Sequence, residues 1–338
     1  MSFRVRAARG DDAEAIYKMA ELTGGGFTNL PADHDTISEK LARSDRSFSR
    51  EGENQAADLY VFVLENPTTG EIRGTCQIFG EVGVVQPFYS YHLSTLTQTS
   101  PELGKTFRNQ LLSLTTDLEG CSEVGGLFLH PDARAGGWGA LLARSRYLFI
   151  KRHRPRFGET VLAELRGVID ENGNSPFWDA ICGRFFDMTF PEADKFNAVH
   201  GTRFIADLMP RTPIYVSLLN ESAQAVMGQP HPSGRGALKM LEDEGFYFER
   251  YLDIFDGGPT VTSDTDDIRT VREAVEETVV EIGEDGPSKV LLATGSLKDF
   301  VACFGNVKRI PRQGLRIGKD AANLLGVKVC DRVLSVAR

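Results

Sequence analysis

Residues 124–149 read VGGLFLHPDARAGGWGALLARSRYLF and decide the fold. They predict an apolar strand, a short loop and a long amphipathic helix. The loop carries Arg134-x-x-Gly137-x-Gly139 where the strand passes into the helix. Glycines allow a sharp turn that exposes consecutive backbone N–H groups, and the start of a helix adds the positive end of its dipole. The stretch therefore predicts a site for a pyrophosphate group, with an ordinary Gly-rich loop as the plainer alternative.

The glycine spacing differs from that of a dinucleotide-binding loop, because no G-x-G-x-x-G follows the strand. Acyl-CoA N-acyltransferases use this spacing to hold the pyrophosphate of coenzyme A, and the chain resembles that superfamily. The resemblance implies a cofactor-binding loop made of Arg134, Gly136, Gly137 and Gly139. We also expect the strand Leu127-Phe128-Leu129 to offer backbone groups to the pantetheine arm, with one N–H polarising the thioester carbonyl. Plain core packing is the alternative for Leu127.

The composition is that of an ordinary globular protein, with 41% hydrophobic and 25% charged residues in 338. A net charge of −9 argues against a nucleic-acid partner. No apolar run has membrane-spanning length and no signal peptide is visible, so we expect no membrane partner. The five cysteines contain no C-x-x-C pair, which predicts a cytoplasmic protein with reduced thiols. The six histidines lack H-x-x-x-H spacing, so we expect no metal site.

Periodicity and turn residues predict an α+β chain. Strands are expected at 2–7, 59–64, 72–82, 88–97, up to 129 and at 160–168, and helices at about 11–22, 36–44, 138–149 and 175–182. The resulting order β-α-α-β-β-β-α-β-α is that of the acyl-CoA N-acyltransferase (GNAT-like) fold, a mixed sheet flanked by helices.

Two segments share one plan of helix, glycine and aromatic strand. They are PFWDAICGRFFDMTF at 176–190 and ALKMLEDEGFYFERYLDIF at 237–255. Because such a unit closes an N-acyltransferase domain, we predict a partial duplication; common helix C-caps are the alternative. The expected domains are an acyl-CoA N-acyltransferase domain at 1–190, a second acyltransferase-like half at 191–260 and a small β-rich C-terminal module at 261–338.

A series of further motifs resembles the arginine N-succinyltransferases over roughly residues 3–275. The motifs are Thr23-Gly24-Gly25-Gly26, Thr28 with Leu30-Pro31, Pro87-Phe88-Tyr89-Ser90-Tyr91, Ser122-Glu123 before Leu127-Phe128-Leu129, Ala163-Glu164 with Arg166-Gly167, Ser175-Pro176-Phe177-Trp178, Leu208-Met209-Pro210, His231-Pro232 and Asp253-Ile254-Phe255-Asp256-Gly257-Gly258-Pro259. The resemblance implies transfer of a succinyl group from succinyl-CoA to the α-amino group of L-arginine, the first step of one route of arginine breakdown. It also implies that His231 is the proton donor and that Leu127 binds succinyl-CoA. A His-Pro loop in itself is more often structural.

The chain departs from the family pattern at three positions. Asn29 stands where the family has Ser, His92 where it often has Arg, and Trp138 where a small or polar residue is usual. Because Asn29 and His92 lie near the expected acceptor pocket, they bear on the identity of the amine.

An arginine substrate carries a guanidinium group, so a carboxylate should face it. The candidates are Glu123, Glu164, Asp170 and Glu171, and Arg166 is a candidate for the substrate's carboxylate. Glu164 and Arg166 stand at i and i+2 on one face of a strand, so pairing with each other is the alternative. Arg144 and Arg146 follow the glycine loop on a helix face, where they could meet phosphate, although arginines on a helix face are more often solvated.

Two other functions remain open from the sequence. The enzyme could use another amine such as ornithine, or another acyl-CoA. The chain could instead be a CoA-binding subunit without activity. As partners we expect the small-molecule substrates, L-arginine and succinyl-CoA, and a homo-oligomer or a heteromer with a paralogous subunit.

Overall fold

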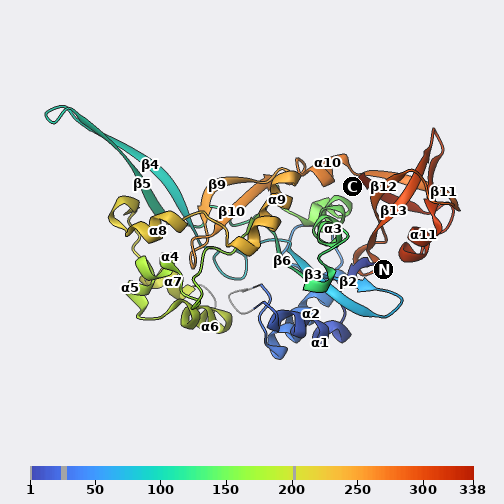
Figure 1. Ribbon diagram of the computed structural model, residues 1–338, viewed down its shortest axis with the longest axis horizontal. Helices are drawn as coiled ribbons and strands as arrows, with labels where there is room; N and C mark the ends of the chain where they lie inside the picture. Colours follow the sequence, from blue (N-terminus) through green and yellow to red (C-terminus); the bar gives the residue numbers. More distant parts are fainter. Residues whose placement is uncertain (1, 24–28, 201–202) are drawn as a thin grey trace.

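The structure, a computed structural model, describes residues 2–23, 29–200 and 203–338. The motif residues Gly24, Gly25, Gly26 and Thr28 lie outside the described residues. The described part is elongated, with one continuous series of hydrogen-bonded strands along its length (Figure 1).

Seven strands form the mixed sheet in the middle of the molecule. In spatial order they are β1 (Arg4–Ala7), β2 (Leu59–Asn66), β3 (Glu71–Phe79), β6 (Ser122–Leu129), β7 (Thr160–Glu164), β10 (Pro259–Asp264) and β9 (Tyr247–Leu252). All neighbouring pairs are antiparallel except β6 with β7, which run parallel. The mixed sheet and its flanking helices agree with the predicted fold class.

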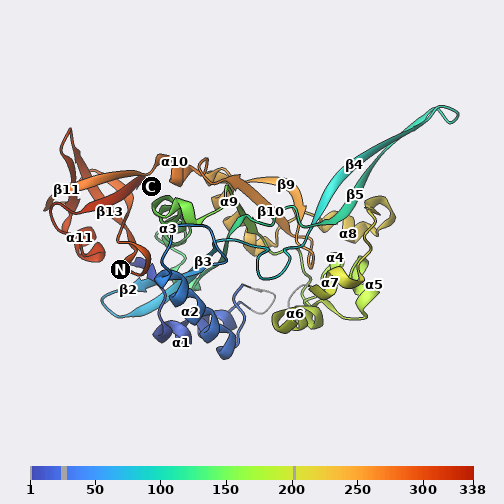
Figure 2. The same cartoon turned by 180° about the vertical axis from the view of Figure 1, so that it is seen from behind.

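Helices cover both faces of this sheet. On one side lie α1 (Ala13–Glu21) and α2 (His34–Ser49), and on the other α3 (Trp138–Arg152) and α9 (Arg235–Glu244) (Figures 1 and 2). Both faces need cover because both are apolar, as strand β2 illustrates. Its side chains point alternately to the two faces and pack in two separate cores. Leu59, Val61 and Val63 pack with α1 and α2, whereas Tyr60, Phe62 and Leu64 pack with α3.

The expected repeat at 176–190 does not form a strand. After α4 (Pro176–Ala180), the chain makes a second helix, α5 (Gly183–Phe186), and then α6 (Phe190–His200). The prediction of an aromatic strand is wrong because these aromatic side chains fill a helical core, where Phe186 stacks on Trp178 at 5.9 Å.

The strand pairing also does not separate the expected domain at 1–190 from the expected second half at 191–260. The segment 235–264 supplies α9, β9 and β10, and β10 pairs with β7 over five residues, from Thr260 opposite Glu164 to Asp264 opposite Thr160. This second copy of the helix-glycine-strand plan therefore extends the same sheet. Gly245 ends α9 with a φ of 103°, as the helix-glycine pattern predicts.

A long hairpin that the sequence predicts only in part leaves this sheet. Its strands are β4 (Ser90–Ser100) and β5 (Lys105–Thr115), and β5 was not expected. The base of β4 pairs with β9, and β5 pairs with β8 (Ile214–Tyr215). The tip projects far from the body (Figure 2). Two helices pack near its base, α7 (Arg203–Leu208) and α8 (Glu221–Val226).

The C-terminal part contains a closed ring of five strands. After α10 (Arg269–Glu273) come β11 (Val275–Gly283), β12 (Ser288–Thr294), β13 (Val301–Ile310), β14 (Gly314–Gly318), α11 (Lys319–Leu325) and β15 (Arg332–Ala337). Within the described residues the pairing runs β12-β15-β11-β14-β13 and returns to β12. The start of β13 also pairs with β1, which joins the ring to the edge of the central sheet.

The ring and the central sheet share one core. Phe300, just before β13, is fully buried, and its ring centroid lies 5.2 Å from that of Phe149 in α3 and 5.8 Å from that of Phe62 in β2. Edge-on aromatic contacts of this kind add to the free energy gained by burying the rings.

We predict that Phe300→Ala destabilises both parts together, by about 3–5 kcal/mol, because it opens a cavity in the shared core. Urea unfolding should show one transition shifted to lower urea. Phe107→Ala on the exposed face of the hairpin is the control and should change the free energy of unfolding by no more than about 0.5 kcal/mol. A separate early transition confined to the C-terminal strands would show that they fold independently.

Candidate active site

A bulge in β6 lies at the predicted pantetheine-binding strand. Gln77 pairs with Gly125 and Thr75 with Phe128, so Cys76 alone faces both Gly126 and Leu127. Gly126 has a φ of +57°, a conformation that glycine adopts without strain. A bulge leaves its extra residue outside the ladder of backbone hydrogen bonds, so it can direct a backbone N–H toward a ligand.

The side chains of this strand are also part of the core, as the alternative interpretation of Leu127 predicts. Leu127 and Leu129 pack against the core that contains α3, and Phe128 packs against the core beneath α1 and α2. All three are only half-buried.

Beyond the start of β6 the two parallel strands part. Pairing between β6 and β7 is limited to Ser122 with Val161 and Glu123 with Leu162. From Val124 onward, β6 has no strand partner on that side among the described residues. Its backbone can therefore pair with an extended ligand, in the way a strand edge binds a peptide.

The glycine loop has the backbone shape that the sequence predicts. Gly136 and Gly137 have φ values of +81° and +83°, and Gly137 precedes the first residue of α3. No side chain caps this helix, so its first N–H groups stay available to an anion. Gly139 is the second residue of α3, where an added Cβ would meet only Leu129 at 3.7 Å. Arg134 is exposed at the edge of the loop.

Trp138, one of the departures from the family pattern, packs inward. Its ring lies 5.1 Å from Phe3 and 6.3 Å from Phe304, in the core shared with the C-terminal ring. The residue therefore anchors the start of α3 in this core, and its half-buried indole also lies against Gly136 of the loop.

Glu123 stands where β6 and β7 begin to part, and it is buried. Its Oε1 accepts a hydrogen bond from Asn29 Nδ2 at 3.1 Å, and Asn29 Oδ1 accepts one from Gln77 Nε2 at 2.9 Å. Lys40 Nζ donates to the Asn29 carbonyl oxygen. Burial raises the pKa of Glu123 to about 7, against the opposing effects of Asn29 and Lys40. Burial also lowers the pKa of Lys40 to about 8.

Three further carboxyl groups surround Glu164 at the end of β7. The pKa of Glu164 is raised well above its usual range by burial and by the negative charges of Asp253, Glu123 and Asp256. Burial likewise raises the pKa of Asp253, and burial and the charge of Asp253 raise the pKa of Asp256 to about 8. The Thr260 hydroxyl lies opposite Glu164 in the register, fully buried and without a hydrogen-bond partner.

The close placement of these four carboxyl groups is electrostatically unfavourable when all are ionised, unless a cation binds among them or some of them stay protonated. Asp256 is partly compensated, because its two oxygens accept hydrogen bonds from the backbone N–H groups of Gly167 at 2.7 Å and Gly258 at 2.8 Å. Glu164 itself is half-buried, and within the described part of the chain no backbone N–H donates to its side chain. Such a site favours a cationic substrate.

His231 reaches the same region from a different loop. The backbone N–H of His231 donates to the Arg166 carbonyl oxygen at 2.8 Å, and Pro230 forms an isolated antiparallel β-bridge with Gly167. The His231 Nδ1 lies 2.7 Å from Ser233 Oγ and accepts a hydrogen bond from the Ser233 backbone N–H at 3.3 Å. Burial and the charge of Arg166 lower the pKa of His231 below 6.5. The lowered pKa favours the neutral form of the ring.

The structure brings Glu123, Glu164, Asn29 and Arg166 to one region, but not the other predicted acceptor residues. Asp170 and Glu171 are exposed, and the Asp170 carboxylate accepts hydrogen bonds from the N–H groups of Asn172 and Asn174 at 2.8 Å. Arg166 is half-buried, and its Nε has no hydrogen-bond partner. His92 lies farther along the sheet, in β4, with its ring 4.8 Å from that of Tyr251. No contact links His92 to the carboxyl groups of Glu123 or Glu164.

Two predictions for arginines on α3 are wrong. Arg144 and Arg146 are buried, not solvated. Arg146 Nη1 donates to the Gly125 carbonyl oxygen at 3.4 Å, beneath the bulge of β6. Arg144 Nε lies 2.8 Å from Glu244 Oε1 of α9. Both guanidinium groups have partners from elements distant in sequence, which the helix pattern alone does not reveal.

Sequence reasoning missed several residues of the site. Asp253 and Asp256 stand in a motif that supports the family resemblance, but nothing in the sequence gave them a role. Lys40 and Gln77 belong to an ordinary helix and strand, and carry no signal before the fold places them beside Asn29.

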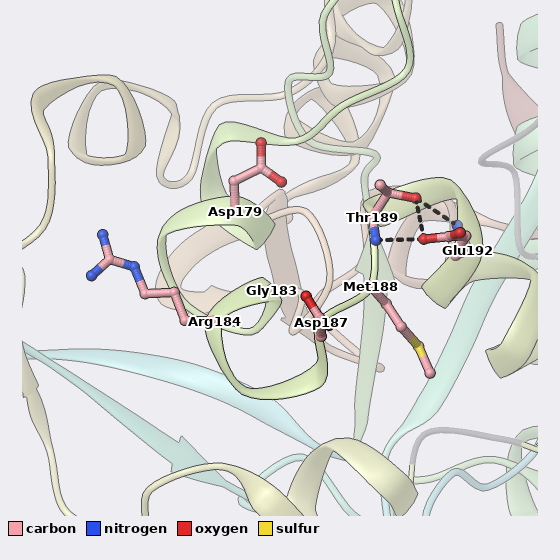
Figure 3. A pocket seen from close by; sticks show the side chains of 7 residues that line it. All are labelled: Asp179, Gly183, Arg184, Asp187, Met188, Thr189 and Glu192. Carbon is pink, nitrogen blue, oxygen red and sulfur yellow. Dashed lines mark hydrogen bonds between the residues drawn. The ribbon is translucent and has the colours of Figure 1, made fainter.

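A hollow of the described surface lies elsewhere, with a volume of about 310 Å³. Figure 3 shows its lining from α4, α5 and the start of α6, where Thr189 and Glu192 hydrogen-bond each other at 2.8 Å. None of the predicted site residues lines it. Within the described residues no group of three or more His, Cys, Asp and Glu is arranged to hold a metal ion, and no helix is long and apolar enough to cross a membrane.

Comparisons with known proteins agree on one family. Residues 3–270 match the model of the arginine N-succinyltransferase beta subunit, and residues 272–337 match that of its C-terminal domain. The chain is 43% identical over 285 residues to the arginine N-succinyltransferase of Citrobacter koseri, covering 84% of this chain and 82% of that protein. It is 41% identical over 301 residues to that of Shigella dysenteriae, covering 89% and 84%.

The solved structure of the arginine/ornithine succinyltransferase subunit AI from Pseudomonas aeruginosa superposes with a TM-score of 0.91. It is 33% identical in sequence, and the match covers 99% of this chain and 98% of that one. The predicted fold and family are thereby confirmed. The family models divide at 270–272, close to the expected start of the C-terminal module at 261.

We predict that the Glu123→Gln variant gains stability relative to the wild type as the pH rises from about 4.5 to 7. The folded protein keeps the Glu123 proton to a higher pH than the unfolded chain does. Within this window the carboxyl group ionises mainly in the unfolded chain, and the wild-type free energy of unfolding therefore falls as the pH rises. Glutamine does not titrate. Urea midpoints measured across the window test this, with the exposed Glu171→Gln as control. A difference between variant and wild type that is constant with pH would contradict the assignment.

Proposed function

The chain belongs to the arginine N-succinyltransferase family, and we propose that it transfers the succinyl group of succinyl-CoA to the α-amino group of L-arginine at the junction of β6 and β7. The observation that carries this proposal is the position of buried carboxyl groups with raised pKa values beside the bulged strand. A cationic acceptor and an acyl donor can meet there. The acyl-CoA N-acyltransferase fold supplies the enzyme class.

We assign the donor to the bulge and the glycine loop. The diphosphate of succinyl-CoA binds to the N–H groups around Gly136, Gly137 and Gly139, with Arg134 at the edge. The pantetheine arm pairs with the open side of β6 along Leu127-Phe128-Leu129. The N–H of Leu127, displaced by the bulge, polarises the thioester carbonyl.

We assign the acceptor to the carboxyl groups and Arg166. The guanidinium of arginine binds Glu164 with Glu123, because a cation relieves the repulsion and burial that raise their pKa values. The half-buried guanidinium of Arg166, with its unpartnered Nε, binds the substrate carboxylate. Asn29 orients Glu123 by a direct hydrogen bond, so this departure from the family pattern lies in the acceptor pocket. We assign His92 no direct contact with the acceptor, because its ring packs against that of Tyr251.

His231 moves the proton between the two substrates. We assign to the reacting enzyme the tautomer in which Nδ1–H donates to Ser233 Oγ, in place of the longer contact that Nδ1 accepts from the Ser233 backbone N–H at 3.3 Å. In this tautomer Nε2 holds a lone pair that takes a proton from the attacking nitrogen. As the carbon–sulfur bond breaks, the ring returns that proton to the leaving thiolate. The ammonium loses two protons in forming an amide and the thiolate takes one, so one proton goes to solvent.

One observation favours ornithine as a second acceptor, because the solved relative from Pseudomonas aeruginosa is described as an arginine/ornithine succinyltransferase. The words "subunit AI" in that description and "beta subunit" in the family name support assembly with a related chain. We propose that the protein works as such an oligomer in the cytoplasm.

We predict succinyl-CoA-dependent release of free thiol with L-arginine as the preferred amine. Purified protein is mixed with succinyl-CoA and a panel of amines that includes ornithine and lysine, and thiol release is followed with a chromogenic disulfide. Acetyl-CoA is the matched donor. Equal turnover with acetyl-CoA, or no response to arginine, would refute the proposed function, and a preference for ornithine would correct the acceptor.

We predict that His231→Ala lowers kcat by about a hundredfold to ten-thousandfold, the range for a positioned acid–base group. Succinyl-CoA affinity, measured by calorimetry, should stay near that of the wild type. In the wild type, kcat/KM should fall as the pH drops below 6.5 and the ring becomes protonated, and this fall should disappear in His231→Gln. Wild-type kcat in both variants would make His231 a residue of loop packing.

A further inference from the structure

A second cavity lies between α3 and α9, apart from the junction of β6 and β7. Its volume is about 170 Å³, below the roughly 300–1,000 Å³ of sites that enclose a whole small molecule. Small side chains of α3, Ala140 and Ala143, form one wall, and Met240 of α9 forms another. A fragment of a ligand fits it better than a complete one.

Three arginines from separate parts of the chain line this cavity. They are Arg144 of α3, Arg269 of α10 and Arg338 after β15. Arg144 is 7% exposed, and its Nη2 is buried without a hydrogen-bond partner. The Nε of Arg269 is also buried and unpartnered. The proximity of Arg269 contributes to the lowering of the pKa of Arg144, after burial as the main cause.

The two acidic residues of the lining are already engaged. Glu244 binds Arg144 Nε at 2.8 Å and accepts hydrogen bonds from the N–H and hydroxyl of Thr270 at 2.8 and 2.9 Å. Asp243 pairs with Lys239 at 2.6 Å. The unpaired donors of the cavity are therefore cationic, and an anion would satisfy them.

Arg338 connects the cavity to the glycine loop. Its Nη2 donates to the Gly136 carbonyl oxygen at 3.2 Å, and its guanidinium lies against Gly137, where a side chain would collide with it. The ring of Phe304 in β13 supports the guanidinium at 5.0 Å. The cavity thus adjoins the loop to which we assign the diphosphate. In coenzyme A, a single ribose separates the diphosphate from a further phosphate on its 3′ oxygen.

We propose that this cavity binds the 3′-phosphate of coenzyme A through Arg269, Arg338 and the free Nη2 of Arg144. The inference rests on the proposed function, because it takes a CoA thioester as the donor. It gives the C-terminal part of the chain a role in donor binding, since Arg269 and Arg338 both lie outside the central sheet.

The test compares CoA with 3′-dephospho-CoA by calorimetry on the full chain. Wild-type protein should bind CoA at least about tenfold more tightly, as expected for a charge-assisted contact to phosphate. In Arg269→Ala and Arg338→Ala that ratio should fall to within about twofold, with affinity for dephospho-CoA unchanged. Arg272→Ala is the matched control, because Arg272 is exposed on the same helix and bonds only to its neighbours Asp267 and Glu273.

The outcomes separate this inference from the proposed function. Equal affinity of the wild type for CoA and dephospho-CoA overturns the inference and leaves the proposed function in place. Variants that lose affinity for both compounds equally also overturn it, because the arginines would then act on the diphosphate or on the fold. Failure of the wild type to bind either compound overturns the succinyl-CoA assignment itself. Arg338 is exposed, so its variant keeps the test valid if Arg269→Ala does not fold.

Discussion

The parting of β6 from β7 after Glu123 is the constraint on which the site depends. Two parallel strands that stayed paired would use all their facing backbone groups in the ladder and leave none for a ligand. Here the pairing stops after two residues, and β6 bulges at Gly126 and Leu127. The bulge needs a glycine, because a side chain at Gly126 would lie 2.9 Å from Gln77 at a φ of +57°. The donor's binding surface is thus mainly backbone.

The same parting explains the electrostatics of the acceptor side. Glu123 comes from the last paired position of β6 and Glu164 from the end of β7, so both carboxyl groups lie where the sheet opens. Asp253 and Asp256 follow β9 and add negative charge at the same place. Burial and repulsion make the fully ionised cluster unfavourable without a ligand, and a guanidinium bound as we propose would offset the negative charge. In that proposal, selectivity for a cationic amine follows from where the strands end.

The sequence predicts what depends on neighbours in the chain, and misses what depends on distant partners. The strand, loop and helix at 124–149, with left-handed glycines at 136 and 137, follow from local pattern and are present. The hydrogen bond from Asn29 to Glu123 joins residues 94 apart, and no spacing rule predicts it. The aromatic run at 184–190 looks like a strand, but it forms the end of α5 and the start of α6, and its Phe186 stacks on Trp178 from α4. Buried Arg144 is explained only by Glu244 on another helix.

The C-terminal ring is structurally part of the enzyme and not an appendage. It pairs with the edge of the central sheet through β1, packs Phe300 against α3, and supports the start of α3 through Phe304 and Trp138. The position of α3 fixes the glycine loop, so the ring acts on the donor side of the site. The proposed acceptor side combines residues 164–256 with Glu123 of β6 and its partner Asn29. Because the C-terminal ring packs against α3 and not against these carboxyl groups, we expect sequence changes in the ring to act on donor binding more than on the choice of amine.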